Sequence, residues 1–436
     1  MHERFRFLEK GELLSKSAEL GIDLPFTDDI TPLFGNLAIG AFTVPNRIVV
    51  QPMEGYDSEN DGSPSDLTKR RYNRFAEGGS GIIWFEAVSV SHEGRSNPHQ
   101  LWINKKNSDH FARLADLVRK SARKNGFDPV LVIQLTHSGR YSKPDGKSKP
   151  LAAAPNPILD KADPYILTDD DLRRIQDQYV VASRLAVRSG FDVIDLKACH
   201  GYLMIEMLAA RGRINSIYGG EEPDRRFSYF LETFDRIEYE AGPGMMTTRL
   251  NTSDLYKGGF GVDDKGSYDP DEPIMLISKL ASRKMKLVNI SMGSPYFNPY
   301  VTRPFDTPLP GQPVPDEHPL EGVIRMINST SEIRKSFPEI HFVGSAWSWL
   351  RHFAPNVGAA VIANGDASFI GFGRNSFAYP SMPYELIKTG KADPAKTCIT
   401  CSGCTRLIRN MHPGGCVIRD REIYGAELKK LIADGG

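Results

Sequence analysis

The chain has 436 residues, of which 40% are hydrophobic and 25% charged, and its 54 lysines and arginines balance its 54 aspartates and glutamates. This composition excludes a disordered or fibrous chain, and the lack of a basic excess argues against nucleic acid or an anionic membrane as a partner. No apolar run approaches the roughly 20 residues of a membrane span, and the N-terminus has no apolar signal core, so we expect a cytoplasmic protein.

Eight short runs rich in Val and Ile are predicted to form β-strands. Each run has four to seven residues, too few for a helix, and helical patterns separate most of them. The runs are Arg47–Val50, Gly81–Ala87, Pro129–Leu135, Phe191–Leu196, Met245–Leu250, Lys286–Ser291, Ile340–Gly344 and Ser368–Gly371. The clearest helix is predicted over 169–189, where Thr168 and Asp171 have the spacing of a capping box and Gly190 follows the last turn.

Eight strands alternating with helices favour an α/β protein with a TIM (β/α)8 barrel. The alternative is a doubly wound sheet, but its Gly-rich fingerprint is matched only weakly and late, at Gly371-x-Gly373. We expect an N-terminal extension at 1–30, a barrel at 31–391 and a C-terminal extension at 392–436. The stretch 292–319 follows the sixth strand and has eight prolines. It is either a rigid surface loop or an aromatic wall over a substrate, formed by Tyr296, Phe297, Tyr300 and Phe305.

Four of the five cysteines lie close together in the C-terminal extension. Their spacing is Cys398-x2-Cys401-x2-Cys404-x11-Cys416. Three evenly spaced thiolates and a distant fourth favour a [4Fe–4S] cluster, whereas structural zinc prefers two separated pairs. Zinc and unligated thiols are the alternatives. Cys199 stands alone and is expected to be a small buried hydrophobe rather than a reactive thiol.

Particular side chains stand where the predicted strands end. Such positions on a barrel are typical of catalytic groups, and the loops after strands seven and eight commonly hold a phosphate. In chain order these residues are Pro52, Met53 and Glu54, Ala87, Gln134, Lys197, His200 and Tyr202, Arg249, Gly344 and Ser345, and Gly373 and Arg374. Backbone N–H groups of the two Gly-containing turns, with the Arg374 guanidinium, suit a phosphate group.

The sequence resembles the old yellow enzyme family of NADH:flavin oxidoreductases. Its iron–sulfur branch, which includes 2,4-dienoyl-CoA reductase and trimethylamine dehydrogenase, is the nearest. The resemblance covers about residues 31 to 425. Its motifs are Asn46-Arg47-Ile48-Val49, the segment 134–140 (QLTHSGR), the segment 191–206 (FDVIDLKACHGYLMIE), Tyr218-Gly219-Gly220 with Arg225-Arg226-Phe227, and the cysteine spacing.

The resemblance implies FMN and roles for four residues. Gln134 resembles the amide that hydrogen-bonds the flavin pyrimidine, and Arg249 resembles the arginine beside flavin N1 and O2. Tyr202 resembles the tyrosine that gives a proton to the substrate. His200 takes the second position of the pair that holds the substrate carbonyl oxygen.

Two residues depart from the family pattern. Lys197 stands where the first histidine of that pair is expected. It either donates to the substrate carbonyl or pairs with Asp195, which lies two residues away on the same strand face. Glu54 stands where the family usually has Thr or Cys beside the flavin. It either lowers the flavin potential or turns away.

The resemblance implies an ene-reductase that reduces a C=C bond conjugated to a carbonyl, in an enone, an enoate or a flavonoid- or steroid-like substrate. The alternatives are an amine dehydrogenase or demethylase and an electron-transfer subunit. Electrons are expected from NADH, NADPH or a separate ferredoxin or flavoprotein, because no nucleotide-binding domain follows the cysteines in this sequence. A cluster with reduced flavin suits an anaerobic setting, and a homo-oligomer is compatible with the family.

Overall fold

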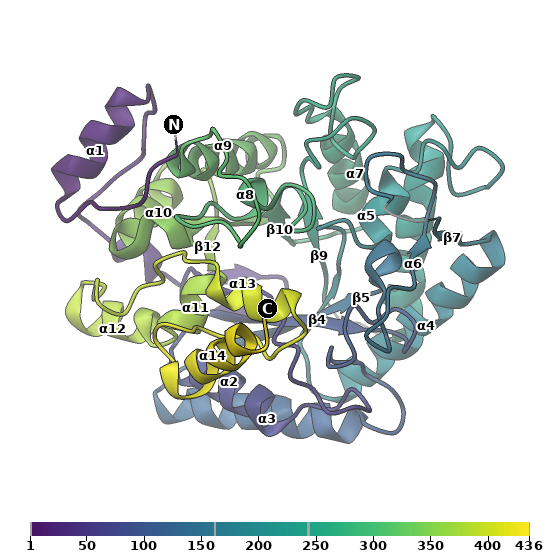
Figure 1. Ribbon diagram of the computed structural model, residues 1–436, viewed down its shortest axis with the longest axis horizontal. Helices are drawn as coiled ribbons and strands as arrows, with labels where there is room; N and C mark the ends of the chain where they lie inside the picture. Colours follow the sequence, from purple (N-terminus) through teal and green to yellow (C-terminus); the bar gives the residue numbers. More distant parts are fainter. Residues whose placement is uncertain (1, 161–162, 242–244, 436) are drawn as a thin grey trace.

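The computed structural model describes residues 2–160, 163–241 and 245–435. At its centre eight parallel strands close into a barrel (Figure 1). In order around the ring they are β3 (Ile48–Val50), β4 (Ile82–Ser89), β5 (Val130–Thr136), β8 (Val193–Leu196), β9 (Met245–Asn251), β10 (Leu287–Ser291), β11 (His341–Gly344) and β12 (Phe369–Phe372). Each predicted run overlaps one of these strands. The TIM barrel is confirmed, and the doubly wound alternative is wrong.

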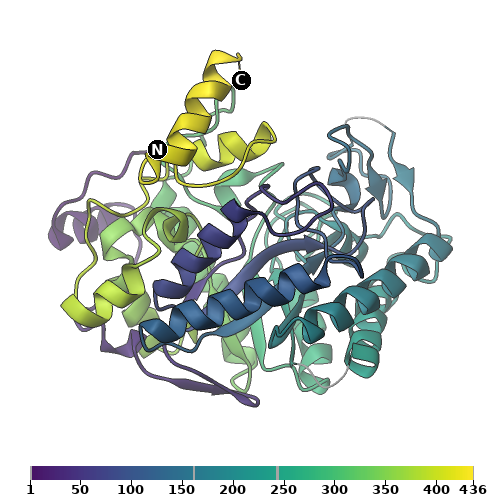
Figure 2. The ribbon, with the colours of Figure 1, turned by 90° about the horizontal axis from the view of Figure 1, so that it is seen from below.

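Helices between the strands form the outer layer of the barrel (Figures 1 and 2). They are α2 (Asp66–Glu77), α3 (Ser108–Lys124), α4 (Asp169–Arg188), α5 (Leu203–Leu208), α6 (Pro223–Ala241), α7 (Asp271–Ser282), α9 (Pro319–Ser336) and α10 (Ala354–Ala363), with α11 (Arg374–Ala378) and α12 (Met382–Thr389) after the last strand. Helix α4 begins as predicted, because the Thr168 hydroxyl accepts from the Asp171 N–H and the Asp171 carboxylate accepts from the Thr168 N–H.

The amino-terminal end of the barrel is closed by a hairpin. Strands β1 (Leu37–Ile39) and β2 (Phe42–Val44) pair antiparallel just before β3. The buried side chains of Ile39 and Val44 pack with Ile82, Trp84 and Val130 in one apolar cluster. A second short pair, β6 (Leu151–Ala152) with β7 (Tyr165–Ile166), lies outside the barrel. With one end sealed by apolar packing, the opposite end is left for a site.

The N-terminal segment packs against the barrel helices. Its helix α1 (Lys10–Glu19) buries Leu13, and Phe5 and Phe7 insert beside Trp349 and Phe353. Asp306, in the Pro-rich stretch, accepts from the Phe5 N–H at 3.1 Å. The segment therefore shares an apolar cluster with helices late in the chain, although the sequence of this stretch is largely polar.

The C-terminal segment lies across the carboxyl-end side of the barrel, beside α2 (Figures 1 and 2). It holds α13 (Gly403–Arg409) and α14 (Ala426–Ala433). Asp420 accepts hydrogen bonds from Arg70 at 2.7 Å and Arg74 at 2.6 Å, both on α2. Within the described ranges, no helix has the length and apolar character needed to cross a bilayer.

Candidate active site

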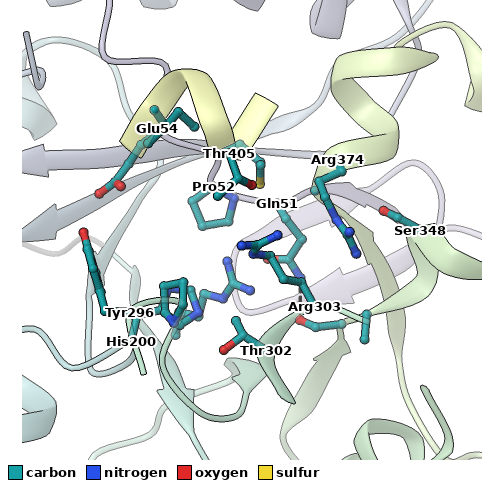
Figure 3. A pocket seen from close by; sticks show the side chains of 18 of the residues that line it. Gln51, Pro52, Glu54, His200, Tyr296, Thr302, Arg303, Ser348, Arg374 and Thr405 are labelled. Carbon is teal, nitrogen blue, oxygen red and sulfur yellow. Dashed lines mark hydrogen bonds between the residues drawn. The ribbon is translucent and has the colours of Figure 1, made fainter. Parts of the chain in front are cut away.

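One large cavity opens at the carboxyl ends of the barrel strands and holds about 980 Å³, including its mouth. Its lining residues are Gln51, Pro52, Met53, Glu54, Lys197, His200, Tyr202, Arg249, Pro295, Tyr296, Thr302, Arg303, Ser345, Ala346, Ser348, Gly371, Gly373, Arg374, Thr405, Ile408 and Arg409. In Figure 3, Glu54, Tyr296 and His200 lie on one side of the cavity, and Arg374 and Ser348 lie on the other. The cavity thus has an acidic, aromatic side and a cationic side.

Ten of the residues predicted at strand ends line this cavity, and three do not. The Ala87 carbonyl accepts from the Gln100 side chain at 2.9 Å, and the Gly344 carbonyl accepts from the Trp347 indole at 2.8 Å. The Gln134 amide nitrogen donates to Asp195 Oδ2 at 2.6 Å. These three contacts belong to the barrel wall rather than to the cavity surface.

Glu54 and Tyr202 form the centre of a buried polar cluster. The Tyr202 hydroxyl donates to Glu54 Oε1 at 3.0 Å and lies 3.0 Å from the Tyr296 hydroxyl. The Tyr56 hydroxyl donates to Glu54 Oε2 at 3.0 Å. Burial raises the pKa of Tyr202 well above its usual value, and the Glu54 charge raises it further. Tyr202 is therefore held as a neutral phenol that carries a proton.

Lys197 faces Glu54, not Asp195. Its Nζ lies 3.7 Å from Glu54 Oε1 and 3.8 Å from the centre of the Tyr202 ring. Asp195 instead accepts hydrogen bonds from the Trp84 indole, the Gln134 side-chain amide and the backbone N–H of Arg249, at 2.6 to 2.7 Å. Of the two alternatives for Lys197, the pair with Asp195 is therefore not formed, because these three donors already use the Asp195 oxygens inside the barrel.

His200 lies at a strained point of the loop after β8. Its φ of 65° is in the left-handed region, which a non-glycine residue adopts at a cost. Its Nε2 lies 2.9 Å from the Ser291 hydroxyl. Burial, with the positive charges of Arg249 and Lys197, lowers the pKa of His200 well below its usual value. A neutral imidazole that accepts from Ser291 at Nε2 carries its hydrogen on Nδ1 and can donate there.

Three arginines bring buried N–H groups to the cavity. Arg249 Nε, both Nη atoms of Arg303 and Nη1 of Arg374 are buried and have no hydrogen-bond partner within the described ranges, and neither has the Thr302 hydroxyl. Buried hydrogen-bond donors normally have a partner, so this set of buried donors without one is suited to binding an anion or a polar ligand. Arg374 is additionally held by a hydrogen bond to the Pro304 carbonyl at 2.6 Å.

The floor of the cavity is built on the Gln51 side chain. Its Nε2 donates to Asn289 Oδ1 at 3.1 Å and to the Ser345 hydroxyl at 3.0 Å, and Asn289 donates back to Gln51 Oε1 at 2.7 Å. A Cβ at Gly371 would come within 2.1 Å of Gln51 Nε2. Glycine is therefore needed at this strand end so that Gln51 can cross the barrel.

Sequence reasoning missed one wall of the cavity. Thr405, Ile408 and Arg409 reach it from α13, between the third and fourth cysteines. The Arg409 guanidinium stacks 3.8 Å from the Tyr296 ring centre, and Tyr296 stacks on Tyr141 at 3.8 Å. Of the four aromatic residues proposed as a substrate wall, only Tyr296 lines the cavity. No local pattern in the sequence indicated that α13 would turn towards the barrel.

The four clustered cysteines line a single smaller cavity beside the barrel. Yet in the described part of the chain, no three His, Cys, Asp or Glu side chains are close enough together to hold one metal ion. The described residues therefore show no site for a single metal ion, and the [4Fe–4S] cluster that the spacing predicts stays a prediction. A single tetrahedral ion with bonds of about 2.3 Å requires closer thiols. Burial raises the pKa of Cys199 to about 12, as expected for an inert buried thiol.

Sequence comparison identifies relatives of this chain. Residues 32–296 match the NADH:flavin oxidoreductase / NADH oxidase family. An NADPH dehydrogenase from Geobacillus sp. (strain WCH70) is 30% identical over 268 residues, which are 61% of this chain and 74% of that protein. An NADPH dehydrogenase from Bacillus subtilis (strain 168) is 30% identical over 237 residues, 53% of this chain and 67% of that protein.

Solved structures share the fold. A 2-naphthoyl-CoA reductase complex has a TM-score of 0.73 at 19% identity, over 92% of this chain and 58% of that one. An old yellow enzyme homologue from Zymomonas mobilis has a TM-score of 0.62 at 21% identity, over 89% of this chain and 98% of that one. With the barrel and the family match together, the chain belongs to the NADH:flavin oxidoreductase family, also called the old yellow enzyme family, and is a flavin-dependent oxidoreductase.

Proposed function

We propose that this enzyme is an FMN-dependent ene-reductase that reduces a C=C bond conjugated to a carbonyl group. The observation that carries the proposal is that Tyr202, a buried phenol, and His200, a neutral imidazole, face the same cavity as the unmatched arginines. A proton donor and a carbonyl ligand are the two protein groups that this reaction needs. The NADPH dehydrogenase relatives support a reduction driven by a nicotinamide donor.

The residues of the cavity fit FMN. Its cationic side has unmatched N–H groups on Arg303 and Arg374, which suit a phosphate, and Gly373 follows β12, where barrels commonly bind one. The unmatched Nε of Arg249 suits the polar edge of the flavin ring. Pro52, Met53 and Ser345 would complete the cofactor contacts. When bound, reduced FMN supplies a hydride to the β-carbon of the substrate.

The protein's own groups then handle the carbonyl and the proton. His200 Nδ1–H donates to the carbonyl oxygen and stabilises the negative charge that develops there. The Tyr202 hydroxyl gives its proton to the α-carbon as the general acid. Tyr296 and Ile408 also line this cavity. Because Lys197 faces Glu54 and Tyr202, His200 alone is assigned to the carbonyl.

We also propose that the four cysteines bind a [4Fe–4S] cluster, which would pass single electrons. Support comes from their spacing and from the one cavity that they line together. Four irons and four sulfides separate their thiolates further than a single ion does. The test is anaerobic reconstitution with iron and sulfide, followed by metal analysis and electron paramagnetic resonance. About four irons per chain are expected, and one zinc per chain would contradict the proposal.

A substrate panel tests the reaction itself. The purified flavoprotein is photoreduced without oxygen and then mixed with enones, enoates, enoyl-CoA thioesters, flavones and steroids, and the oxidised flavoprotein is mixed separately with amines. Reoxidation by an unsaturated carbonyl compound is expected, with the saturated product found by mass spectrometry. Reoxidation by none of them would reject the ene-reductase. Oxidised flavin reduced by amines alone would favour an amine dehydrogenase.

The identity of the electron donor is tested under the same oxygen-free conditions. NADPH and NADH are each added to the oxidised enzyme without oxygen, and flavin bleaching is followed in a stopped-flow instrument. The family match supports direct reduction by one of them. Bleaching by neither, with bleaching by reduced ferredoxin, would show that a protein partner feeds the enzyme.

Substitution of Tyr202 by Phe tests the proton donor. The ring is kept and only the hydroxyl is lost, so flavin content and substrate affinity should stay near those of the parent enzyme. Reoxidation in a single turnover should slow by about 100-fold or more, the usual contribution of a general acid. Unchanged reoxidation would remove Tyr202 from the mechanism.

A further inference from the structure

A lysine ammonium lies against the face of the proposed proton donor. Lys197 Nζ is 3.8 Å from the centre of the Tyr202 ring, and the Lys197 side chain is only 4% exposed. A desolvated ammonium over an aromatic ring is attracted more strongly than one in water. Its attraction increases further when the ring becomes a phenolate, because a full negative charge then replaces the ring quadrupole.

Glu54 holds both members of this pair. Its Oε1 accepts from the Tyr202 hydroxyl at 3.0 Å and lies 3.7 Å from Lys197 Nζ. Its Oε2 accepts from the Tyr56 hydroxyl, which also lies 2.8 Å from the Ser96 hydroxyl. An isolated buried ammonium is costly, and the Glu54 carboxylate is the opposite charge that lies beside Lys197.

We infer that Lys197 and Glu54 are positioning residues for Tyr202. Lys197 stabilises the negative charge of the Tyr202 phenolate, and Glu54 holds the lysine and the phenol in place next to each other. The catalytic meaning of this pair rests on the proposed function. Glu54 acts through the Tyr202 hydroxyl, and Lys197 acts through the Tyr202 ring.

Proton transfer from Tyr202 forms one bond and breaks one bond. A C–H bond forms from the electron pair of the enolate-like α-carbon, and the Tyr202 O–H bond breaks and leaves its pair on the phenolate oxygen. The step itself moves no other electrons. Lys197 lies over the ring that receives the charge, and the Tyr296 hydroxyl, 3.0 Å away, can donate to the phenolate oxygen. A proton from cavity water then restores the phenol.

The neighbours of Tyr202 predict the direction of each effect. A positive charge favours the phenolate and a negative charge favours the phenol. Within the described part of the chain, the polar and charged groups that face Tyr202, directly or through Tyr296, are Glu54, Tyr56, Ser96, Tyr141, Lys197, Tyr296 and Arg409. Lys197→Met should therefore shift ionisation of Tyr202 to higher pH, whereas Glu54→Gln should shift it to lower pH.

The test is a titration of Tyr202 alone in the FMN-bound enzyme. 3,5-Difluorotyrosine, whose phenol is more acidic, is placed at position 202 by amber suppression, and its ¹⁹F resonance is followed against pH. The midpoint should rise by about one pH unit or more in Lys197→Met and fall by about one in Glu54→Gln. Lys388→Met is the matched control, because Lys388 lies 4.6 Å from the Tyr384 ring on the surface. It should not move the midpoint.

An unchanged midpoint in either variant, or shifts of the same sign in both, would overturn the inference. A general loss of packing cannot produce shifts of opposite sign. If Lys197→Met does not fold, Lys197→Gln and Glu54→Gln still provide the two signs. The titration needs no substrate, so it can succeed even when the substrate panel rejects the ene-reductase, and the two failures are thus distinguished.

Discussion

Burial decides the charge of the titratable side chains around the barrel mouth. Asp195 is fully buried, and its burial raises its pKa to about 6, although three donors lie on its oxygens. His137, just after β5, has its pKa lowered to about 4 by burial. Its Nδ1 accepts from the Gly139 N–H at 3.1 Å. The folded protein therefore keeps His137 neutral at a pH where the unfolded chain protonates it.

His137 predicts a loss of stability in mild acid. Its pKa is about 4 in the folded state and 6.5 as the reference value for the unfolded chain. Between pH 6.5 and 4 mainly the unfolded state binds this proton, so the His137 contribution to the free energy of unfolding falls by about 2 kcal/mol between pH 7 and 4.5. Buried carboxyl groups with raised pKa values, such as Asp195, contribute in the opposite direction, so the His137 contribution is measured as the difference between parent and variant in urea titrations at both pH values. The change in stability between the two pH values should differ from that of the parent by this amount in His137→Asn and should equal that of the parent in His110→Asn, an exposed site on α3. Equal changes in both variants would contradict the assignment.

At the scale of elements, the C-terminal segment forms part of the wall of the cavity. Helix α13 contributes three lining residues, and the Gly414 N–H donates to the Gly55 carbonyl at 2.6 Å, next to Glu54. The segment is fastened on its other side to α2 by Asp420. The cysteine-bearing segment is therefore in direct packed contact with the cavity wall on one side and with α2 on the other.

Asp420→Asn should loosen this attachment. The Asp420 side chain is 7% exposed, while Arg70 and Arg74 are 40% and 31% exposed, so the arginines can turn to water. Amide hydrogens of the segment 417–435 are expected to exchange about tenfold faster, which is about 1.4 kcal/mol of local stability, with little change in the barrel. Mass spectrometry of the exchanged peptides measures this. Glu422→Gln, which makes the same change at an exposed neighbour, should leave exchange as it is.

At the scale of the whole molecule, segments from both chain ends meet over the Pro-rich stretch. Asp306 accepts from the Phe5 N–H, from the Trp349 indole at 2.7 Å and from Arg351 at 2.7 Å. Its own N–H donates to the Thr400 hydroxyl at 3.1 Å. We propose that the N-terminal residues are an integral layer of the protein rather than a loose extension.

Phe5→Ala tests this integration. The ring is 6% exposed and packs edge-on against Trp349 with centroids 5.2 Å apart. Removing it leaves a cavity and should lower the free energy of unfolding by about 3–5 kcal/mol. Leu8→Ala is the control, because Leu8 is 78% exposed and should change stability by less than about 0.5 kcal/mol. If Phe5→Ala and the parent protein had equal free energies of unfolding in a denaturant titration, the N-terminal segment would contribute little to stability.

Local sequence patterns determined the barrel. Each strand is a short run of β-branched and apolar residues between helical patterns, and a buried parallel strand needs no more than that to be predicted. The same reasoning located ten lining residues, because the carboxyl ends of parallel strands face one side of a barrel. The cap of α4 at Thr168 is also a local signal, and it is confirmed.

The tertiary structure alone decided which side chains are partners across the barrel. Lys197 and Asp195 share a strand face, yet Asp195 is used by donors from β4, β5 and β9, and Lys197 meets Glu54 from the loop after β3. The approach of α13 to Tyr296 is likewise a contact between distant segments. A strand's composition reflects its own burial, whereas an ion pair depends on how separate strands and loops are brought together, which no local pattern encodes.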